Sequence, residues 1–456
     1  MLKIINPATE EVLDEVAEDT PRSIAEKVAK ARLIQRDWAR VSLDRRLDAI
    51  RRFAALLADQ RSRLEKTLTQ EVGKPIIQSG NELKGMEARV DFFLKNTRAV
   101  LAEERVLEDD EQRLEEIITH EPLGVIANLS AWNYPYYVGS NVFLPALLAG
   151  NAVLYKPSEY ATLTGQAIAK LLHKAGVPED IFVPIIGNGD VGAELVKQPV
   201  DGVFFTGSYA TGKRVAEAVA GRMIRVQMEL GGKDPVYVCE DVDVETAAAA
   251  VADGAYYNTG QSCCSVERIY VHRRITARFI EAFVETVKKF VLGDPMDPAT
   301  YLGPLTRSNQ LRVLRRQVLD AEAKGATCFR GGQRVPERGY FYEPRVLTDV
   351  DHTMDLMREE SFGPVIGIQS VGGDAEAVAL MNDTPYGLTA GVYTPKRKRA
   401  EKILAEMNAG TAYWNCCDRV SPRLPWSGRG HSGIGTTLST YGIQTFLQPK
   451  AWHMRG

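Results

Sequence analysis

From Gly124 onward, short runs of apolar residues alternate with segments long enough to form helices. The apolar runs occur in GVIANLS, NAVLYKPS, IFVPIIG and GVFFTGS, and residues 162–175 and 212–220 are two of the helix-length segments. Strands that are apolar on both faces are typical of a parallel sheet covered by helices on both sides. Because ligands of such sheets bind beyond the carboxyl ends of the strands, we expect a binding site where these runs end.

The same alternation returns later in the chain and predicts a second α/β unit. VYVCE and RIYVH are expected to be strands, followed by helices over residues 246–256 and 275–292. The first hundred residues carry apolar side chains at helical spacing, over 25–38 and as one helix over 46–66. After a charged stretch, residues 114–120 are expected to form a strand outside the main sheet. A chain of 456 residues is long enough for two or three domains.

Charge and cysteine usage argue against several classes of protein. The net charge is −3, so no overall field favours nucleic acid, and the basic run over 396–399 is expected to be an exposed helix start. Six cysteines without C-x-x-C spacing and six scattered histidines predict neither a disulfide framework nor a metal site. No apolar stretch has the length of a membrane span or the character of a signal peptide, so we expect a cytoplasmic protein without membrane partners.

Two side chains are candidates for catalysis. Cys263 lies in YNTGQSCCS among small and polar residues, so no apolar run encloses its thiol. Glu229 lies in MELGG beside two glycines, and in an apolar cleft its pKa would rise to suit a base near neutral pH. The alternatives are a small buried cysteine and a surface carboxylate before a turn.

Two motifs that follow apolar runs have the chemistry of a cofactor site. Gly207 and Ser208 begin GSYATGKR, a strand-to-helix turn that suits a phosphate at a helix N-terminus, although an Arg replaces the hydroxyl of an ATP-binding loop. In YKPSE, Lys156 and Glu159 could hold ribose hydroxyls, and Ser158 is expected to cap the next helix. A tight turn and a helix cap are the alternative interpretations.

Two further motifs are less specific. Asn133 in AWNYP carries an amide that could donate to a developing oxyanion, although an Asn in this setting is more often a turn residue. Residues 359–364, EESFGP, place two acids before an aromatic residue and a rigid turn, and no physical argument alone makes them functional.

In their order along the chain, these motifs resemble the NAD(P)-dependent aldehyde dehydrogenase superfamily. WNYP, GNAVLYKPSE, FTGS-x-x-x-G, MELGGKDP, N-x-GQ-x-C, LGP and EESFGPV occur in family order over essentially the whole chain. The resemblance implies Cys263 as the nucleophile, Asn133 as an oxyanion donor and Glu229 as the base that releases the acid from a thioester. It assigns the following residues to the cofactor site: Trp132, Lys156, Ser158, Glu159, Gly207, Ser208, Glu360 and Phe362.

The resemblance implies an α/β fold with a Rossmann-like cofactor domain, an α/β catalytic domain and a small β oligomerisation flap. We assign 1–103 and 123–231 to the cofactor domain and 232–431 to the catalytic domain. The flap would comprise 104–122 and 447–456, and its strands would pair subunits into a homodimer or homotetramer.

The resemblance also bears on cofactor and substrate. The carboxylate of Glu159 would repel the 2′-phosphate of NADP, so NAD is expected and NADP is the alternative. Relatives that act on succinic semialdehyde carry an Arg where this chain has Asn141. That difference favours an uncharged aliphatic or aromatic aldehyde, with a semialdehyde as the alternative. The expected entrance residues are aromatic: Tyr134, Tyr136, Tyr137, Tyr256, Tyr257 and Trp414.

One departure from the family concerns proton transfer. Thr436 and Thr437 stand where many relatives carry a second Glu in a distal proton relay, so that relay is absent here. A P-loop nucleotide hydrolase, a cysteine hydrolase and a non-catalytic protein on the same scaffold are the rival interpretations.

Overall fold

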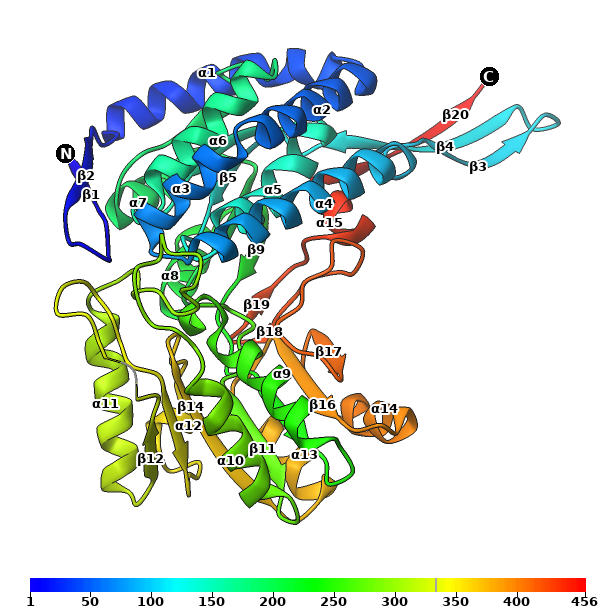
Figure 1. Ribbon diagram of the computed structural model, residues 1–456. Helices are drawn as coiled ribbons and strands as arrows, with labels where there is room; N and C mark the ends of the chain where they lie inside the picture. The colour runs from blue at the N-terminus through cyan, green and yellow to red at the C-terminus, as the bar shows by residue number, and fades with distance from the viewer. Residues whose placement is uncertain (333) are drawn as a thin grey trace.

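Two large sheets organise the chain, as the computed structural model shows for residues 1–332 and 334–456 (Figure 1). The first has six strands in the order β19-β9-β8-β5-β6-β7, and the second has seven in the order β12-β13-β14-β11-β10-β16-β17. Apart from the edge strands β19 and β12, the strands of both sheets pair in parallel. The parallel sheets predicted from the apolar runs are therefore confirmed. Figure 1 shows the first sheet with its helices above the second.

The six-stranded sheet aligns the ends of its central strands. Leu129 pairs with both Lys156 and Phe205, and Thr206 pairs with Glu229, so the residues that follow these strands share one rim. This rim is where ligands of parallel sheets bind. The strands are β5 (Val125–Leu129), β6 (Ala152–Lys156), β7 (Phe182–Pro184), β8 (Gly202–Thr206), β9 (Arg225–Glu229) and β19 (Gly433–Ile434).

Helices from the first half of the chain pack around this sheet. The prediction of one helix over 46–66 is wrong, because the chain turns at Gln60 and forms two helices there. This turn allows Leu57 and Leu64, on either side of it, both to be buried in the same core. The helices are α1 (Pro21–Arg40), α2 (Leu43–Asp59), α3 (Arg61–Val72), α4 (Ile76–Val100), α5 (Pro135–Ala149), α6 (Thr162–Lys174), α7 (Gly189–Lys197) and α8 (Tyr209–Val219); β1 (Leu2–Ile5) and β2 (Val12–Val16) precede them.

The seven-stranded sheet has a separate hydrophobic core on each face. One core includes residues of α9 and α10, and the other includes residues of α11 to α14. Its strands are β10 (Pro235–Val238), β11 (Arg268–His272), β12 (Thr327–Arg330), β13 (Arg345–Thr348), β14 (Val365–Val371), β16 (Thr389–Tyr393) and β17 (Thr411–Trp414). The remaining elements are α9 (Val244–Tyr256), η1 (Tyr257–Gly260), α10 (Thr276–Val287), α11 (Gln310–Ala323), α12 (Asp355–Arg358), α13 (Asp374–Asn382), β15 (Tyr386–Gly387), α14 (Arg397–Ala405), β18 (Arg429–Gly430) and α15 (Ser439–Gln444).

A third, antiparallel sheet projects from the body of the molecule (Figure 1). In it β4 (Leu114–Pro122) pairs with β3 (Glu104–Asp109) on one side and β20 (Leu447–Arg455) on the other. The strand expected over 114–120, outside the main sheet, is confirmed. Apolar side chains on this sheet are exposed: Val106, Leu107, Trp452 and Met454. No helix in the described part of the chain combines the length and apolar character needed to cross a membrane.

Candidate active site

The loop that carries Cys263 begins with three residues in left-handed backbone conformations. Helix α9 runs into η1, where Asn258, Thr259 and Gly260 have φ values of 54°, 57° and 71°. Left-handed conformations are costly for residues other than glycine and are maintained where surrounding contacts hold them. Here the Asn258 N–H donates to Gln78 Oε1 at 2.9 Å, and Thr259 Oγ1 donates to the Gly303 carbonyl at 3.2 Å. The loop is thus anchored from two other parts of the chain.

Gln261 connects this loop to the rim of the six-stranded sheet. Its carbonyl oxygen accepts hydrogen bonds from Asn133 Nδ2 at 3.1 Å and from Asn258 Nδ2 at 3.0 Å. Its side-chain oxygen accepts from the Thr306 N–H at 2.9 Å. The bond from Asn133 places its side-chain amide beside the main chain at Gln261, two residues before Cys263.

The adjacent cysteines occupy different environments. Both line the same cavity, but Cys263 is half-buried, whereas Cys264 is only 3% exposed and its thiol donates to Asp418 Oδ1 at 3.1 Å. A hydrogen bond with Cys263, burial and the charge of Asp418 raise the pKa of Cys264 well above the usual thiol value. Because the thiolate is the reactive form, this shift makes Cys264 a poor nucleophile.

Glu229, the last residue of β9, is a buried carboxylate in the same cavity. Its side chain accepts a hydrogen bond from Thr437 Oγ1. Burial raises the pKa of Glu229 to about 7, against the opposing effects of the Thr437 hydrogen bond and the positive charge of Arg89. A carboxyl group with this pKa can act as a base near neutral pH.

The cavity that Cys263 and Glu229 share has a volume of about 230 Å³. Of the aromatic residues expected at the entrance, Tyr134, Tyr137 and Tyr257 line it, as does Trp426. Three expected entrance residues are not among its lining residues: Tyr136 and Tyr256 are buried in the cores, and the Trp414 indole donates to the Thr394 carbonyl at 2.8 Å. Tyr136 and Tyr256 lie in helices. The sequence pattern of a helix does not distinguish the face that packs in a core from the face that lines a cavity.

Arg89, a residue of α4 that lines this cavity, was missed in the sequence analysis. It is 2% exposed, and its Nε donates to Asn141 Oδ1 at 2.9 Å. The expectation of an uncharged substrate assumed that the cavity has no cation, because Asn141 stands where some relatives carry an Arg. That assumption is wrong, since α4 places the Arg89 guanidinium beside Asn141. The pattern did contain evidence for it, because Arg89 lies at helical spacing with the buried Met86, Val90 and Phe93.

Lys156, Ser158 and Glu159 follow β6 on the rim. Lys156 Nζ is buried, donates to the Pro157 carbonyl at 3.0 Å and lies 4.0 Å from Glu159 Oε2. The expected helix cap at Ser158 is wrong, because α6 begins at Thr162 and Ser158 Oγ instead donates to Glu159 Oε2 at 3.2 Å. Among the described residues, the side-chain hydrogen bonds of this group stay within residues 156–160.

Gly207 and Ser208 follow β8 on the same rim. The Gly207 N–H donates to the Glu229 carbonyl at 3.0 Å, which joins this turn to the strand that ends in the buried carboxylate. Ser208 is exposed and caps α8 by accepting from the Thr211 N–H at 3.4 Å. The tight strand-to-helix turn is therefore present, and it directs the N-terminus of α8 toward the rim.

Residues 359–364, which precede β14 of the second sheet, lie beside the diglycine that follows Glu229. Glu360 Oε1 accepts from the Gly232 N–H at 3.2 Å, and burial raises the pKa of Glu360 to about 8. The Phe362 ring lies 5.6 Å from the Trp132 ring, edge to face. Glu267, which sequence reasoning missed, accepts from the Phe362 N–H at 2.9 Å. It therefore holds this segment in place.

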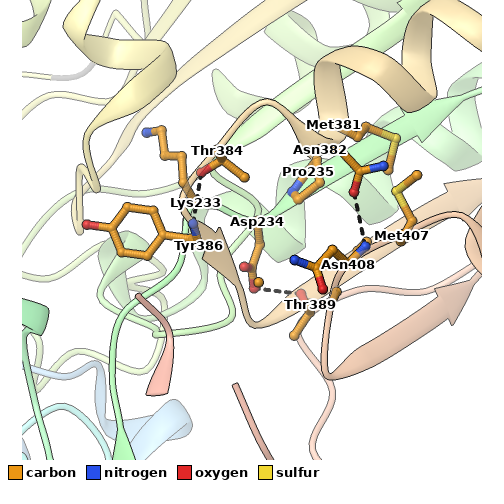
Figure 2. Close-up of a pocket in the computed structure, with 13 residues that line it drawn as sticks. Lys233, Asp234, Pro235, Met381, Asn382, Thr384, Tyr386, Thr389, Met407 and Asn408 are labelled. Carbon is orange, nitrogen blue, oxygen red and sulfur yellow. Dashed lines mark hydrogen bonds between the residues drawn. The ribbon is translucent and has the colours of Figure 1, made fainter. Parts of the chain in front are cut away.

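A second cavity, of about 20 Å³, lies between β10, α13 and β16 (Figure 2). In it Thr389 Oγ1 donates to Asp234 Oδ2 at 2.6 Å. A space of this size holds about one water molecule, so it is too small for an aldehyde or a nucleotide. No cluster of three or more metal-type ligands occurs within residues 1–332 and 334–456.

Comparison with known proteins identifies the fold as that of one family. The Aldehyde dehydrogenase family matches residues 1–452. The chloroplastic betaine aldehyde dehydrogenase of Amaranthus hypochondriacus is 33% identical over 462 residues, covering 98% of this chain and 92% of the relative. An NAD-dependent aldehyde dehydrogenase from Sinorhizobium meliloti superimposes with a TM-score of 0.95 at 30% identity, covering 100% of this chain and 91% of that one. An NADP-dependent enzyme of E. coli gives a TM-score of 0.95 at 27% identity, with 100% and 94% coverage.

The chain belongs to the aldehyde dehydrogenase family. It is an NAD(P)-dependent aldehyde dehydrogenase that oxidises an aldehyde with NAD or NADP as cofactor. The family resemblance and the α/β fold inferred from the order of motifs are both confirmed.

Proposed function

We propose that this protein oxidises an aldehyde to the free carboxylic acid through a thioester on Cys263, with NAD as the preferred cofactor. The observation that carries the proposal is the shared cavity, which holds an accessible thiol and a buried carboxylate, Glu229, with a pKa of about 7. A nucleophile and a base in one enclosed space are what a two-step acyl transfer requires.

In the first step, the Cys263 thiolate attacks the aldehyde carbon and forms a C–S bond, so the carbonyl oxygen becomes an oxyanion. One amide hydrogen of Asn133 is used by the Gln261 carbonyl, and its second hydrogen and the Cys263 N–H stabilise the oxyanion. A dinucleotide held by the residues of the rim would supply the hydride acceptor for this adduct. Cys263 is left as a thioester.

In the second step, Glu229 removes a proton from water as the water attacks the thioester carbon. The C–S bond breaks, the acid leaves and the Cys263 sulfur is regenerated. The balance is aldehyde, oxidised cofactor and water giving acid, reduced cofactor and a proton. Because acylating relatives lack the Glu at this position, its presence here favours hydrolysis over transfer to coenzyme A.

The residues on the rim fit a dinucleotide. Lys156 and Glu159 offer a donor and an acceptor close together, as two ribose hydroxyls require, and the N-terminus of α8 at Ser208 suits a pyrophosphate. The Trp132 and Phe362 rings pack edge to face, and Glu360 lies beside the diglycine after Glu229. The Glu159 carboxylate would repel a 2′-phosphate, which favours NAD over NADP.

The projecting sheet supports assembly into a homodimer or homotetramer. Within the described part of the chain, each of its outer strands, β3 and β20, pairs on one edge only, and both carry exposed apolar side chains, including Trp452 and Met454. Such edges are commonly covered by another chain. We assign residues 104–122 and 447–456 to this interface, 1–103 and 123–231 to cofactor binding, and 232–431 to catalysis.

The test is NADH formation with aliphatic, aromatic, carboxylated and amine-bearing aldehydes, measured for the wild type and Cys263→Ala. We expect turnover that Cys263→Ala abolishes while NAD binding, followed by fluorescence, remains. Absence of NADH or NADPH with every aldehyde would contradict the proposal and favour the non-catalytic alternative. Magnesium-dependent ATP turnover would instead support the nucleotide-hydrolase alternative.

A further inference from the structure

The carboxylates of the substrate cavity already have protein donors. Glu82 is paired with the buried Lys74 and also accepts from the N–H of Tyr136 at 2.8 Å. Asp418 Oδ1 accepts from Ser262 Oγ at 2.9 Å and from the neighbouring Cys264 thiol. Their negative charge is therefore already compensated or hydrogen-bonded without a ligand.

The guanidinium of Arg89 lacks a comparable partner. Its Nε donates to Asn141 Oδ1 at 2.9 Å and its Nη1 to the Gly85 carbonyl at 3.1 Å, both neutral acceptors. Within residues 1–332 and 334–456, Arg89 forms no direct ion pair and its Nη2 has no hydrogen-bond acceptor, although the charges of Glu82 and Glu229 act on it from a distance and oppose the lowering of its pKa by burial. The other arginine of the cavity, Arg419, is paired with Asp253 at 3.5 Å. Buried charges are rare without a counter-ion, because removing them from water is costly.

Two of the four aromatic residues that line the cavity, Tyr134 and Tyr137, already contact cations of the protein. The rings of Tyr134 and Tyr137 are stacked, with centroids 5.7 Å apart and planes 5° from parallel. Lys74 Nζ lies 3.6 Å from the Tyr134 centroid, and the Arg89 guanidinium carbon lies 3.8 Å from the Tyr137 centroid. Aromatic faces attract quaternary ammonium groups in proteins that bind them, but a third cation here would meet two of like charge.

We propose that the cavity selects aldehydes bearing a carboxylate, and that Arg89 is the residue that binds this carboxylate while the aldehyde carbon meets Cys263. This inference rests on the proposed function and names its substrate class. A substrate carboxylate supplies the direct ion pair that Arg89 lacks, and Nη2 supplies a charge-assisted hydrogen bond. It replaces the expectation of an uncharged aldehyde, which rested on Asn141, and it separates this protein from relatives named for the cationic betaine aldehyde.

The test compares kcat/KM for three small aldehydes of different charge: 4-oxobutanoate, butanal and betaine aldehyde. The wild type should prefer 4-oxobutanoate over both others. Arg89→Gln should lower the ratio of kcat/KM for 4-oxobutanoate to that for butanal by roughly 10- to 150-fold, the range of a lost hydrogen bond to a charged group. The ratio cancels any effect of Arg89 on Glu229, because both substrates need the same base.

Two matched variants control for position and for folding. Arg419 lies in the same cavity but is already paired with Asp253. Arg419→Gln should therefore leave the ratio of kcat/KM for 4-oxobutanoate to that for butanal at its wild-type value. Arg89→Lys keeps the charge and should retain part of the preference if Arg89→Gln fails to fold. Asp418→Asn tests the alternative that a carboxylate of the cavity binds the cationic group of betaine aldehyde.

Each outcome has a definite meaning. The inference is overturned if the wild type prefers butanal or betaine aldehyde, if Arg419→Gln changes the ratio and Arg89→Gln does not, or if Asp418→Asn selectively abolishes use of betaine aldehyde. Those results leave the proposed chemistry intact. Only a wild type inactive on all three aldehydes and on the wider panel contradicts the chemistry itself.

Discussion

Replacing Thr437 with Val tests whether this hydroxyl keeps Glu229 in its basic form. Thr437 is fully buried and donates to the Glu229 carboxylate. Its backbone is fixed independently, because its N–H and carbonyl exchange hydrogen bonds of 2.9 and 2.8 Å with Trp426. Thr437→Val therefore removes the donor while preserving side-chain shape and main-chain position.

The size of the effect follows from the hydrogen bond that is lost. A hydrogen bond to a charged group contributes about 1.5–3 kcal/mol. At 1.36 kcal/mol per pKa unit, its loss should raise the pKa of Glu229 by about 1–2 units from its value of about 7. Glu229 acts as a base only when ionised, so activity falls as the pH drops through this pKa. At pH 7 the ionised fraction would fall from about one half to about one tenth or less, and deacylation would slow by roughly 5- to 50-fold.

The assay is the pH dependence of steady-state kcat between pH 6 and 10, combined with the pre-steady-state burst of NADH. We expect the low-pH limb of Thr437→Val to move upward by about 1–2 pH units, while the burst amplitude is at least that of the wild type because only deacylation slows. Thr436→Val is the matched control and should leave the limb in place. A limb for Thr437→Val that coincides with the wild type, or moves to lower pH, would refute the reasoning.

Three further changes test separate parts of the account. Glu229→Gln should give a burst of about one NADH per site and then turn over more slowly by roughly 10²–10⁴-fold, since general-base catalysis is lost; an unchanged steady state would remove Glu229 from deacylation. Glu159→Gln should increase kcat/KM with NADP relative to NAD, because it removes the charge that repels a 2′-phosphate; an unchanged ratio would show that specificity lies elsewhere. Glu267→Ala should lower the free energy of unfolding by about 3–5 kcal/mol in denaturant titrations, because it leaves the buried Lys233, now 2.6 Å from Glu267, without its partner; a change below about 1 kcal/mol would contradict this.

Residues within short motifs could be predicted from the sequence because the motif itself creates their environment. Cys263 follows small and polar residues, and Glu229 precedes two glycines, so both were candidates from local pattern. The parallel sheets followed in the same way, because strands buried on both faces must be apolar throughout.

The residues that were missed act through contacts between distant segments. Arg89 meets Asn141, 52 positions away, and Thr437 meets Glu229, 208 positions away. Helical periodicity gives the buried face of α4 but does not tell whether that face adjoins the core or a cavity. The break at Gln60 was missed for a related reason: no glycine or proline marks it, and packing of the helices on each side determines the turn.

The most direct test of the central claim is mass spectrometry of Glu229→Gln after reaction with NAD and an accepted aldehyde. Slow deacylation should leave the acyl group on the protein, and fragmentation of the peptide that contains both adjacent cysteines should locate it on Cys263. An acyl group on Cys264, or no adduct despite a measured burst of NADH, would contradict the assignment of Cys263 as the nucleophile.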